Sequence, residues 1–292
     1  MSDAYLEIFL NSALSGGNLW SPLALMFLFF ARFLPIIALA PFFGARVLPH
    51  PVKIVFAICM FTIFLPKLLE VTTTPLLFDS TMLLYLVKEM FIGFILGFLI
   101  GMPFMIVQNT GIIIDHQRGG ASLMVNDPTI QNQSSPLGTL FNFVLIAIFY
   151  MLDGPFLFID ALVTSYEIVP PDQFFNRSFF ATDSPFWKVQ MMDILNKMMV
   201  ITIRLASPAL ITILMTDVFL GIANRMAPQV QITFLGMPLK SLLALAVVFL
   251  GWQLFTEELG HEIYYWLSYI NNTLGLFKAS MGAAGATGTA GI

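Results

Sequence analysis

The sequence predicts an all-α integral membrane protein made of kinked helices and helical hairpins. Of its 292 residues, 58% are hydrophobic and 10% are charged, whereas a soluble domain carries about 25% charged residues. Apolar runs recur along the chain, and prolines or glycines interrupt several of them. The amount of apolar sequence predicts membrane helices, and the interruptions predict that these helices bend.

Six apolar runs approach the length of about 20 residues that a transmembrane helix needs. They cover residues 19–43, 52–69, 82–107, 137–152, 198–222 and 239–255, of which the second and fourth are short for a span. A further run, residues 155–169, contains Asp160 and is expected to lie at the membrane interface or inside protein. Arg46 and Lys53 make one loop basic, and Arg225 and Lys240 another. If all six runs span, both basic loops are cytoplasmic and both termini are outside.

Four ionisable residues lie inside or at the edge of apolar runs. They are Arg32, Arg204, Asp217 and Lys240. Each costs about 2.5–3.5 kcal/mol at the centre of an inserted helix. Such side chains usually face protein or a water-filled path, and the alternative is snorkelling or ion pairing near a helix end. Arg204 and Asp217 are too far apart on one helix to pair with each other, so each is expected to have a partner elsewhere.

Prolines and glycines in the apolar runs predict close helix packing. The prolines expected to kink or end helices are Pro35, Pro41, Pro103 and Pro208. Such breaks are tolerated where neighbouring groups satisfy the freed carbonyls. Gly93, Gly97 and Gly101 form two overlapping GxxxG steps, which allow another backbone to approach closely. These features predict a chain surrounded by protein rather than by lipid.

Several function classes are disfavoured. A net charge of −4 argues against nucleic-acid binding, which uses basic patches. The single cysteine, Cys59, excludes an intrachain disulfide, and the histidines are too scattered for a metal motif. The sequence contains no GxSxG elbow and no GxxxxGK[ST] loop. Asp153 and Asp217 form a conceivable protease pair, but nothing around them supports it. The sequence therefore predicts a protein that is not an enzyme and needs no cofactor.

Two polar segments are more elaborate than simple connectors. Residues 108–138 combine amides and glycines with apolar residues at 112–114 and 123–125. Because irregular backbone at membrane depth is tolerated only inside protein, this loop is expected to fold into a protein-lined cavity, the alternative being a structured surface hairpin. In residues 221–240, a helix is expected to end at 224–228 and to resume at Pro238. This turn is shaped for contact with protein. The tail, residues 279–292, is predicted to be disordered.

Several blocks carry a family resemblance. They are PFFGARVLPHPVK (41–53), GIIIDHQRGGAS (111–122), NDP (126–128), Ser165–Tyr166 with Pro170, and LGIANRMAPQVQITFLGMPLK (220–240). In this order they resemble the FliR/SctT (YscT/SpaR) family of inner-membrane export-apparatus proteins of bacterial type III secretion, over roughly residues 5–275. The stretch DHQRGGAS is closer to the injectisome members, which serve virulence, than to flagellar members, which tend to have QMG there.

The resemblance implies a T-type subunit of the export gate, a multi-pass protein of the bacterial inner membrane. Such a subunit assembles with R-type and S-type subunits into a channel for unfolded secretion substrates, next to a U-type switch protein. An R-like part would cover residues 1–190 and an S-like hairpin residues 191–278. The assembled gate of the family lies largely above the bilayer plane, so not every apolar run is a simple span.

The resemblance also suggests roles for particular residues. Those expected to form a plug that closes the channel are Ile112, Ile113, Ile114, Asp115, Arg118, Gly119, Leu123, Met124 and Val125. Those expected at the cytoplasmic hairpin tip, in contact with a partner, are Asn224, Arg225, Pro228, Gln229 and Lys240. The alternative is that Arg225 and Lys240 only set orientation. The competing functions are a flagellar counterpart and, from another class, a secondary transporter with broken helices. Only RFLP and RLASP, at 32–35 and 204–208, echo the repeat that a transporter would have.

Overall fold

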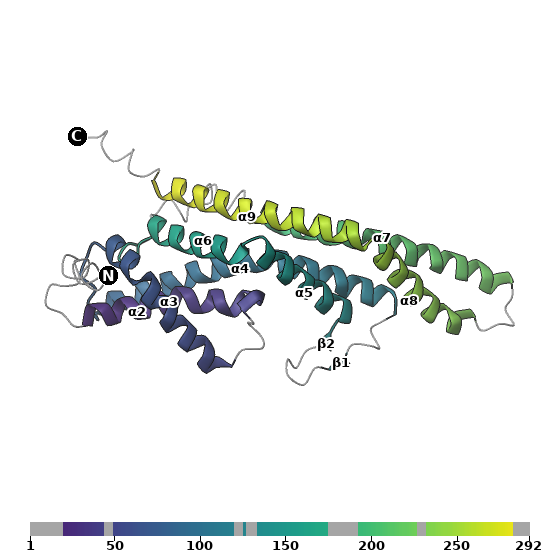
Figure 1. Cartoon of the computed structure of the whole chain (residues 1–292), viewed down its shortest axis with the longest axis horizontal. Helices are drawn as coiled ribbons and strands as arrows, with labels where there is room; N and C mark the ends of the chain where they lie inside the picture. The colour runs from purple at the N-terminus through teal and green to yellow at the C-terminus, as the bar shows by residue number, and fades with distance from the viewer. Residues whose placement is uncertain are drawn as a thin grey trace. The chain divides into compact units, whose positions relative to one another are not determined.

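The described part of the chain is almost entirely helical, which confirms the predicted fold class. The computed structural model describes residues 20–43, 49–119, 125–126, 133–174, 192–226 and 232–282 (Figure 1). The extended structure within these ranges is one antiparallel ladder between β1 (Val125–Asn126) and β2 (Gln133–Ser134). The helices account for the rest of the architecture.

The helices follow the apolar runs of the sequence. In chain order they are α2 (Trp20–Leu39), the 3-10 helix η2 (Pro41–Phe43), α3 (His50–Val71), α4 (Ser80–Gln117), α5 (Pro136–Met151), α6 (Gly154–Ile168), α7 (Met192–Met226), α8 (Ile232–Leu250) and α9 (Trp252–Gly282). Proline positions explain where two helices begin, because proline fits the first helical turn but lacks the N–H that the helix interior needs. Pro51 and Pro136 lie in first turns, while Pro35, Pro103 and Pro208 lie inside helices.

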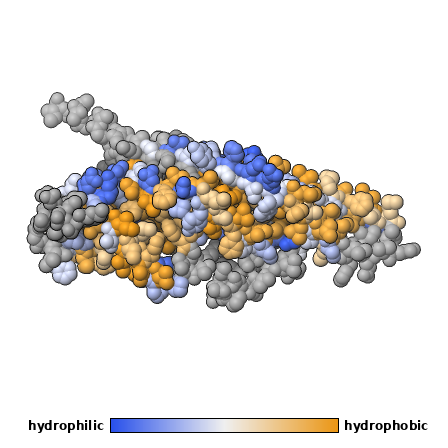
Figure 2. All heavy atoms as spheres, viewed as in Figure 1, coloured by the Kyte–Doolittle hydropathy of each residue, from blue (hydrophilic) through white to orange (hydrophobic). Residues whose placement is uncertain are grey.

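The membrane character is clear from helix length and composition. Among the described residues, α2, α3, α4 and α7 are each long and apolar enough to span a membrane. The count rises to six if the bent pairs α5–α6 and α8–α9 each form one span. Figure 2 shows apolar residues over much of α7 and α8, and hydrophilic residues gathered along α9. The chain is therefore a membrane protein.

The chain divides into two compact units. Unit 1 combines residues 1–101, 153–192 and 267–292, and unit 2 combines residues 102–152 and 193–266. In unit 1, Phe29 of α2 stacks on Phe33 at 5.2 Å and on Tyr166 of α6 at 6.1 Å between ring centroids. In unit 2, Phe141 of α5 packs on Phe255 of α9 at 4.5 Å. Buried aromatic pairs of this kind add to the stability that apolar burial already provides.

The predicted loop at residues 108–138 is wrong in extent at both ends. Helix α4 continues to Gln117 and α5 begins at Pro136. Helical backbone continues because the side chains there keep a buried face, with Ile114 only 1% exposed. The Thr110 hydroxyl, which is also buried, donates to the Ile106 carbonyl of the preceding turn. Polar residues in this stretch are therefore part of a packed helix rather than of irregular backbone.

Three other boundaries differ from the predictions. Helix α8 begins at Ile232 and contains Pro238, which was expected to be its start. The run at 239–255 is interrupted at Gly251, where α8 and α9 bend by 64°. Glycine has a freer backbone than other residues and destabilises a helix interior, so the helical run breaks readily at this position. Finally, α9 includes residues 279–282 of the predicted tail, because alanine and methionine favour helix continuation.

Candidate functional site

The end of α4 and the start of α5 are joined by a polar clasp made of Asp115, Arg118 and Ser135. Arg118 donates from Nε and NH2 to Asp115 Oδ1, each at 2.7 Å. The Ser135 hydroxyl donates to Asp115 Oδ2, which also accepts the backbone N–H of Leu137 at 3.0 Å. The three side chains of the clasp are at most 7% exposed. Charge-assisted hydrogen bonds are stronger at such a buried position than at the surface, because the local dielectric constant is low.

Local sequence explains how the clasp forms. Ser135 is the N-cap of α5, and its Oγ accepts the N–H of Gly138 at 2.9 Å, a bond that satisfies one of the free donors of the first turn. Gly111 of α4 faces this cap, and a Cβ there would lie 2.3 Å from the Gly138 backbone nitrogen. A side chain at this position would therefore push α4 and α5 apart, so glycine allows the carboxylate of Asp115 to reach the cap.

Helix α8 contacts the clasp from the other side. Arg118 donates from NH1 to Ser241 Oγ at 3.0 Å. One turn earlier, Met237 packs beside the end of α4, its Cγ 3.8 Å from where a Cβ would stand on Gly119. Gly119 has φ +87°, a left-handed conformation that glycine adopts without strain and that ends helices. Residues 237 and 241 thus form one contact stripe toward α4.

The next stripe of α8 contacts α7. Lys240 forms an ion pair with Asp217 of α7, which gives Asp217 the partner that the sequence required. One turn earlier, a Cβ on Gly236 would lie 3.0 Å from Leu220 Cδ1 of α7. Residues 236 and 240 therefore face α7 while 237 and 241 face α4. Lys240 lies inside α8 and not at the hairpin tip where it was expected.

The other predicted plug residues do not lie in one element of the structure. Ile112, Ile113 and Ile114 are on the last turns of α4, and only Ile114 is fully buried. Leu123 and Met124 lie outside the described residues. Val125 belongs to β1, and its side chain is not among those described. The contact between Asp115 and Arg118 that their spacing predicts is present. Their role in a plug stays a prediction.

The predicted hairpin tip is described in part. Asn224 and Arg225 are exposed in the last turn of α7, which ends at Met226 as the sequence suggested. Pro228 and Gln229 lie outside the described residues. The exposed basic side chain at the end of a helix complements the negative end of the helix dipole. Partner contact at this tip stays a prediction.

The glycine stripe of α4 lies against α2 of the same chain. A Cβ on Gly93 would stand 2.1 Å from the Arg32 carbonyl oxygen, and one on Gly97 would stand 3.0 Å from Ile36 Cα. At Gly101 the nearest atom would be the Leu39 oxygen at 3.2 Å. The backbones of α2 and α4 therefore approach most closely at Gly93 and separate toward Gly101.

A buried charge cluster, made of Arg32, Lys88 and Glu89, lies one turn from this crossing point. Arg32 binds both carboxylate oxygens of Glu89, through NH2 at 2.9 Å and through Nε. It also donates to Ser165 Oγ at 3.1 Å and to the Val169 carbonyl at 2.8 Å. The Tyr166 ring lies over the guanidinium, 3.9 Å from its carbon to the ring centroid. Arginine suits this site because its planar fork can serve several acceptors and an aromatic face together.

Lys88 fixes the turn that follows α6. Its ammonium donates to the carbonyls of Pro170, Pro171 and Gln173 at 2.8–3.0 Å and pairs with Glu89 at 2.8 Å. The sequence points to Arg32 but not to Lys88 and Glu89, because a charged pair near the start of an apolar run looks like a solvated helix end. Arg32 itself indicates that a buried acid must lie near it, but it does not show which acid that is.

Two buried carboxylates, those of Glu89 and Asp115, are held in ion pairs, whereas Oδ2 of the buried Asp172 accepts bonds from Thr73 and Thr74. Glu89 is paired with Arg32 and Lys88, and Asp115 with Arg118. In the ranges that the structure describes, no three His, Cys, Asp or Glu side chains cluster as metal ligands. The arrangement holds helices together and neutralises buried charge.

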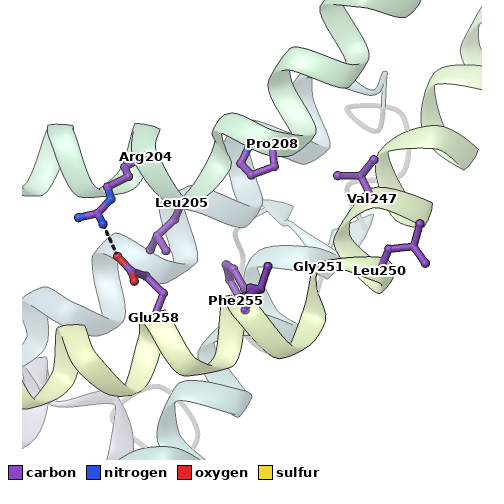
Figure 3. Close-up of a pocket in the computed structure, with 9 residues that line it drawn as sticks. Arg204, Leu205, Pro208, Val247, Leu250, Gly251, Phe255 and Glu258 are labelled. Atoms are coloured by element: carbon purple, nitrogen blue, oxygen red, sulfur yellow. Dashed lines mark ion pairs between the residues drawn. The ribbon is translucent and has the colours of Figure 1, made fainter.

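An apolar groove opens where α7, α8 and α9 meet (Figure 3). It has a volume of about 530 Å³, and its lining includes Leu205, Pro208 and Phe255. At one end Arg204 of α7 and Glu258 of α9 point toward each other and pair at 2.8 Å. The pair gives Arg204 the separate partner that the sequence required. The groove lies at the Gly251 bend, where α8 turns into α9.

Comparison with known proteins connects this arrangement to a family. A family model described as bacterial export proteins, family 1, matches residues 23–265. Yop proteins translocation protein T of Yersinia pestis is 33% identical over 165 residues, which cover 56% of this chain and 61% of that protein. Surface presentation of antigens protein SpaR of Shigella flexneri is 30% identical over 163 residues, covering 56% and 60%. Flagellar biosynthetic protein FliR of Bacillus subtilis is 28% identical over 224 residues, covering 73% and 80%.

The aligned part of the chain spans about three fifths of the length of the Yersinia and Shigella relatives. The family match is broader, since residues 23–265 include the buried charge cluster, the polar clasp and the α7–α8 hairpin. The chain therefore belongs to the bacterial export proteins, family 1, and the FliR/SctT resemblance of its sequence blocks is confirmed.

Proposed function

We propose that the chain is a non-enzymatic subunit of a type III secretion export gate, the channel through which unfolded proteins cross the bacterial inner membrane. The observation that carries this proposal is the family match over residues 23–265 of a helical membrane protein. Relatives named for Yop translocation and for surface presentation of antigens favour an injectisome over a flagellar system. In this proposal the subunit serves a virulence-associated secretion system.

The exposed surface fits contact with lipid or with other membrane subunits. Exposed large apolar side chains are frequent on α7 and α8. Examples are Ile203, Ile211, Leu214, Val218, Phe219, Leu242 and Phe249. Apolar area on this scale marks contact with lipid or with partner protein. The partners we propose are R-type and S-type gate subunits, with a U-type switch protein at the hairpin tip formed by 224–229. Within the subunit, 1–190 would be the R-like part and 191–278 the S-like hairpin.

We also propose that the connection between α4 and α5 contributes to closing the channel before export. A resting conduit wide enough for an unfolded chain would leak ions unless apolar groups exclude water from a constriction. The polar clasp holds both ends of this connection together, so the residues between them start and finish at a fixed place. Deleting residues 119–126 should make the assembled gate permeable to ions while subunit levels stay normal. Unchanged conductance of the assembled deletion variant would remove the closing role.

The test of the proposed function is purification of the tagged chain from its own host in mild detergent, with its partners identified by mass spectrometry. A gate subunit should bring small hydrophobic export proteins in fixed ratio, and deletion of its gene should stop secretion until the gene is restored. A secondary transporter would instead be purified alone or as a homo-oligomer, with secretion unaffected by the deletion. That result would overturn the proposal.

A further inference from the structure

We propose that residues 240–241 of α8 couple the α7–α8 hairpin to the polar clasp, so that displacement of the hairpin loosens the junction of α4 and α5. Two adjacent side chains carry this inference, since Lys240 pairs with Asp217 of α7 and Ser241 accepts a bond from Arg118 of the clasp. In the proposed gate, this coupling would relay partner contact at the hairpin to the closing segment, and that use rests on the proposed function.

Helix α8 packs against both α7 and α4. Its contacts with α7 at Gly236 and Lys240 and its contacts with α4 at Met237 and Ser241 each repeat after one helical turn. Residues four apart lie on one face of a helix, so the two stripes are neighbours on the same helix. A shift of α8 that follows α7 must change the separation between Ser241 and Arg118.

Arg118 is the positioning residue that transmits the shift. Its Nε and NH2 bind Asp115, while NH1 binds Ser241. The guanidinium is planar and rigid, so it cannot follow Ser241 without rotating away from Asp115. Asp115 in turn holds the Ser135 hydroxyl and the Leu137 N–H. The Arg118 side chain therefore gives movement at α8 a direct route to the first turn of α5.

The backbone amides of Leu137 and Gly138 report directly on this state. The first donates to Asp115 and the second to Ser135, so their hydrogen exchange accelerates when the clasp loosens. In the full chain purified in detergent, Ser241→Ala should accelerate exchange of these amides about tenfold, because a hydrogen bond to a charged group is lost. That factor corresponds to about 1.4 kcal/mol. Ser207→Ala is the matched control, because the Ser207 hydroxyl donates to the Arg204 carbonyl of its own helix.

The decisive variant is Asp217→Asn, which weakens the pair between α7 and α8 without touching the clasp. It should also accelerate exchange of the Leu137 and Gly138 amides, and it should add nothing when Ser241 is already alanine. Lys240→Met breaks the same pair from the α8 side and serves if Asp217→Asn does not fold. Unchanged amides in the folded variant, or a full additional effect in the Ser241→Ala background, would overturn the coupling.

This measurement is independent of the proposed function. Exchange is measured on the purified chain and needs no partner, whereas the proposed function is tested by purification with partners and by secretion. A chain that shows coupling but purifies alone would support the coupling and contradict the proposed gate function. A chain that purifies with export proteins but shows no coupling would support the proposed gate function and contradict the coupling.

Discussion

The buried charge cluster and the polar clasp each bury an arginine with an acid. They differ in where the remaining donors of the arginine find their acceptors. Arg32 has bonds to Glu89, Ser165 and the Val169 carbonyl, all in the interior of unit 1. Arg118 has an equally buried partner in Asp115, yet its NH1 reaches a serine at a part-buried position on another helix. Breaking a fully buried ion pair costs a large free energy, because it leaves uncompensated charge in the interior. Breaking a single hydrogen bond to a serine costs much less free energy.

The comparison suggests that the cluster is a fixed joint and the clasp a joint that can loosen. Around Arg32, three elements and a backbone turn share one set of charges, and Gly93 brings α2 and α4 into backbone contact beside it. Around Arg118, the contacts with α8 include one hydroxyl, that of Ser241, and one apolar side chain, that of Met237. The proposed channel subunit would need both kinds of joint, because its scaffold would have to persist while its gate changed state.

The largest expected effect comes from removing the shared acid of the fixed joint. Glu89→Ala leaves Arg32 and Lys88 buried without their carboxylate, which should lower the free energy of unfolding by at least about 3–5 kcal/mol. Folded protein should therefore be nearly absent from detergent extracts, as measured by size-exclusion chromatography. Arg32→Lys should retain part of the stability, since one ammonium replaces a multi-dentate fork. Normal recovery of monodisperse Glu89→Ala protein would contradict a fixed joint.

The glycine stripe should give a graded loss of stability. Alanine at Gly93 would place a Cβ 2.1 Å from backbone oxygen, against 3.0 Å at Gly97 and 3.2 Å at Gly101. Overpacking costs about 1–3 kcal/mol or more when backbone must move. Thermal unfolding in detergent should therefore rank Gly93→Ala as the most destabilised and Gly101→Ala as the least. An equal effect at the three positions would show that contact with α2 does not set their importance.

An intermediate effect is expected at the clasp. Asp115→Asn keeps the shape of the side chain but removes the charge that Arg118 faces at 2.7 Å. Loss of one partner of a buried pair is costly, yet Arg118 still has Ser241 as an acceptor. The unfolding midpoint should fall by less than for Glu89→Ala, with the change in hydrogen exchange concentrated at residues 115–119 and 136–142. A change spread evenly over both units would contradict a local clasp.

The smallest effect is expected where the same residue type is exposed. Glu70 is 69% exposed and pairs with Lys67 one turn away on α3. Exposed ion pairs contribute little to stability, because solvent screens them. Glu70→Ala should therefore unfold at nearly the temperature of the unchanged chain, and it is the matched control for Glu89→Ala. If both glutamate variants lost similar stability, burial would not explain the difference between the sites.

The sequence predicted what depends on local pattern. Apolar runs located most helices, and the spacing of Gly93, Gly97 and Gly101 indicated a close helix contact. The partner helix and the acid opposite Arg32 were not predictable, because they depend on which helices meet in space. The predicted loop at 108–138 is too long because polar residues such as Asp115 lie inside α4, where contacts with α5 satisfy them.

The most direct test of the central claim, that this chain is one subunit of a larger export channel, is photo-crosslinking from neighbouring positions on α7. Leu214 is 54% exposed and Ile213 is fully buried. A photoreactive residue at 214, introduced into the chain in its own host, should capture another export-apparatus protein, while one at 213 should react only within the chain. Capture of lipid alone at 214, with secretion intact, would contradict the account.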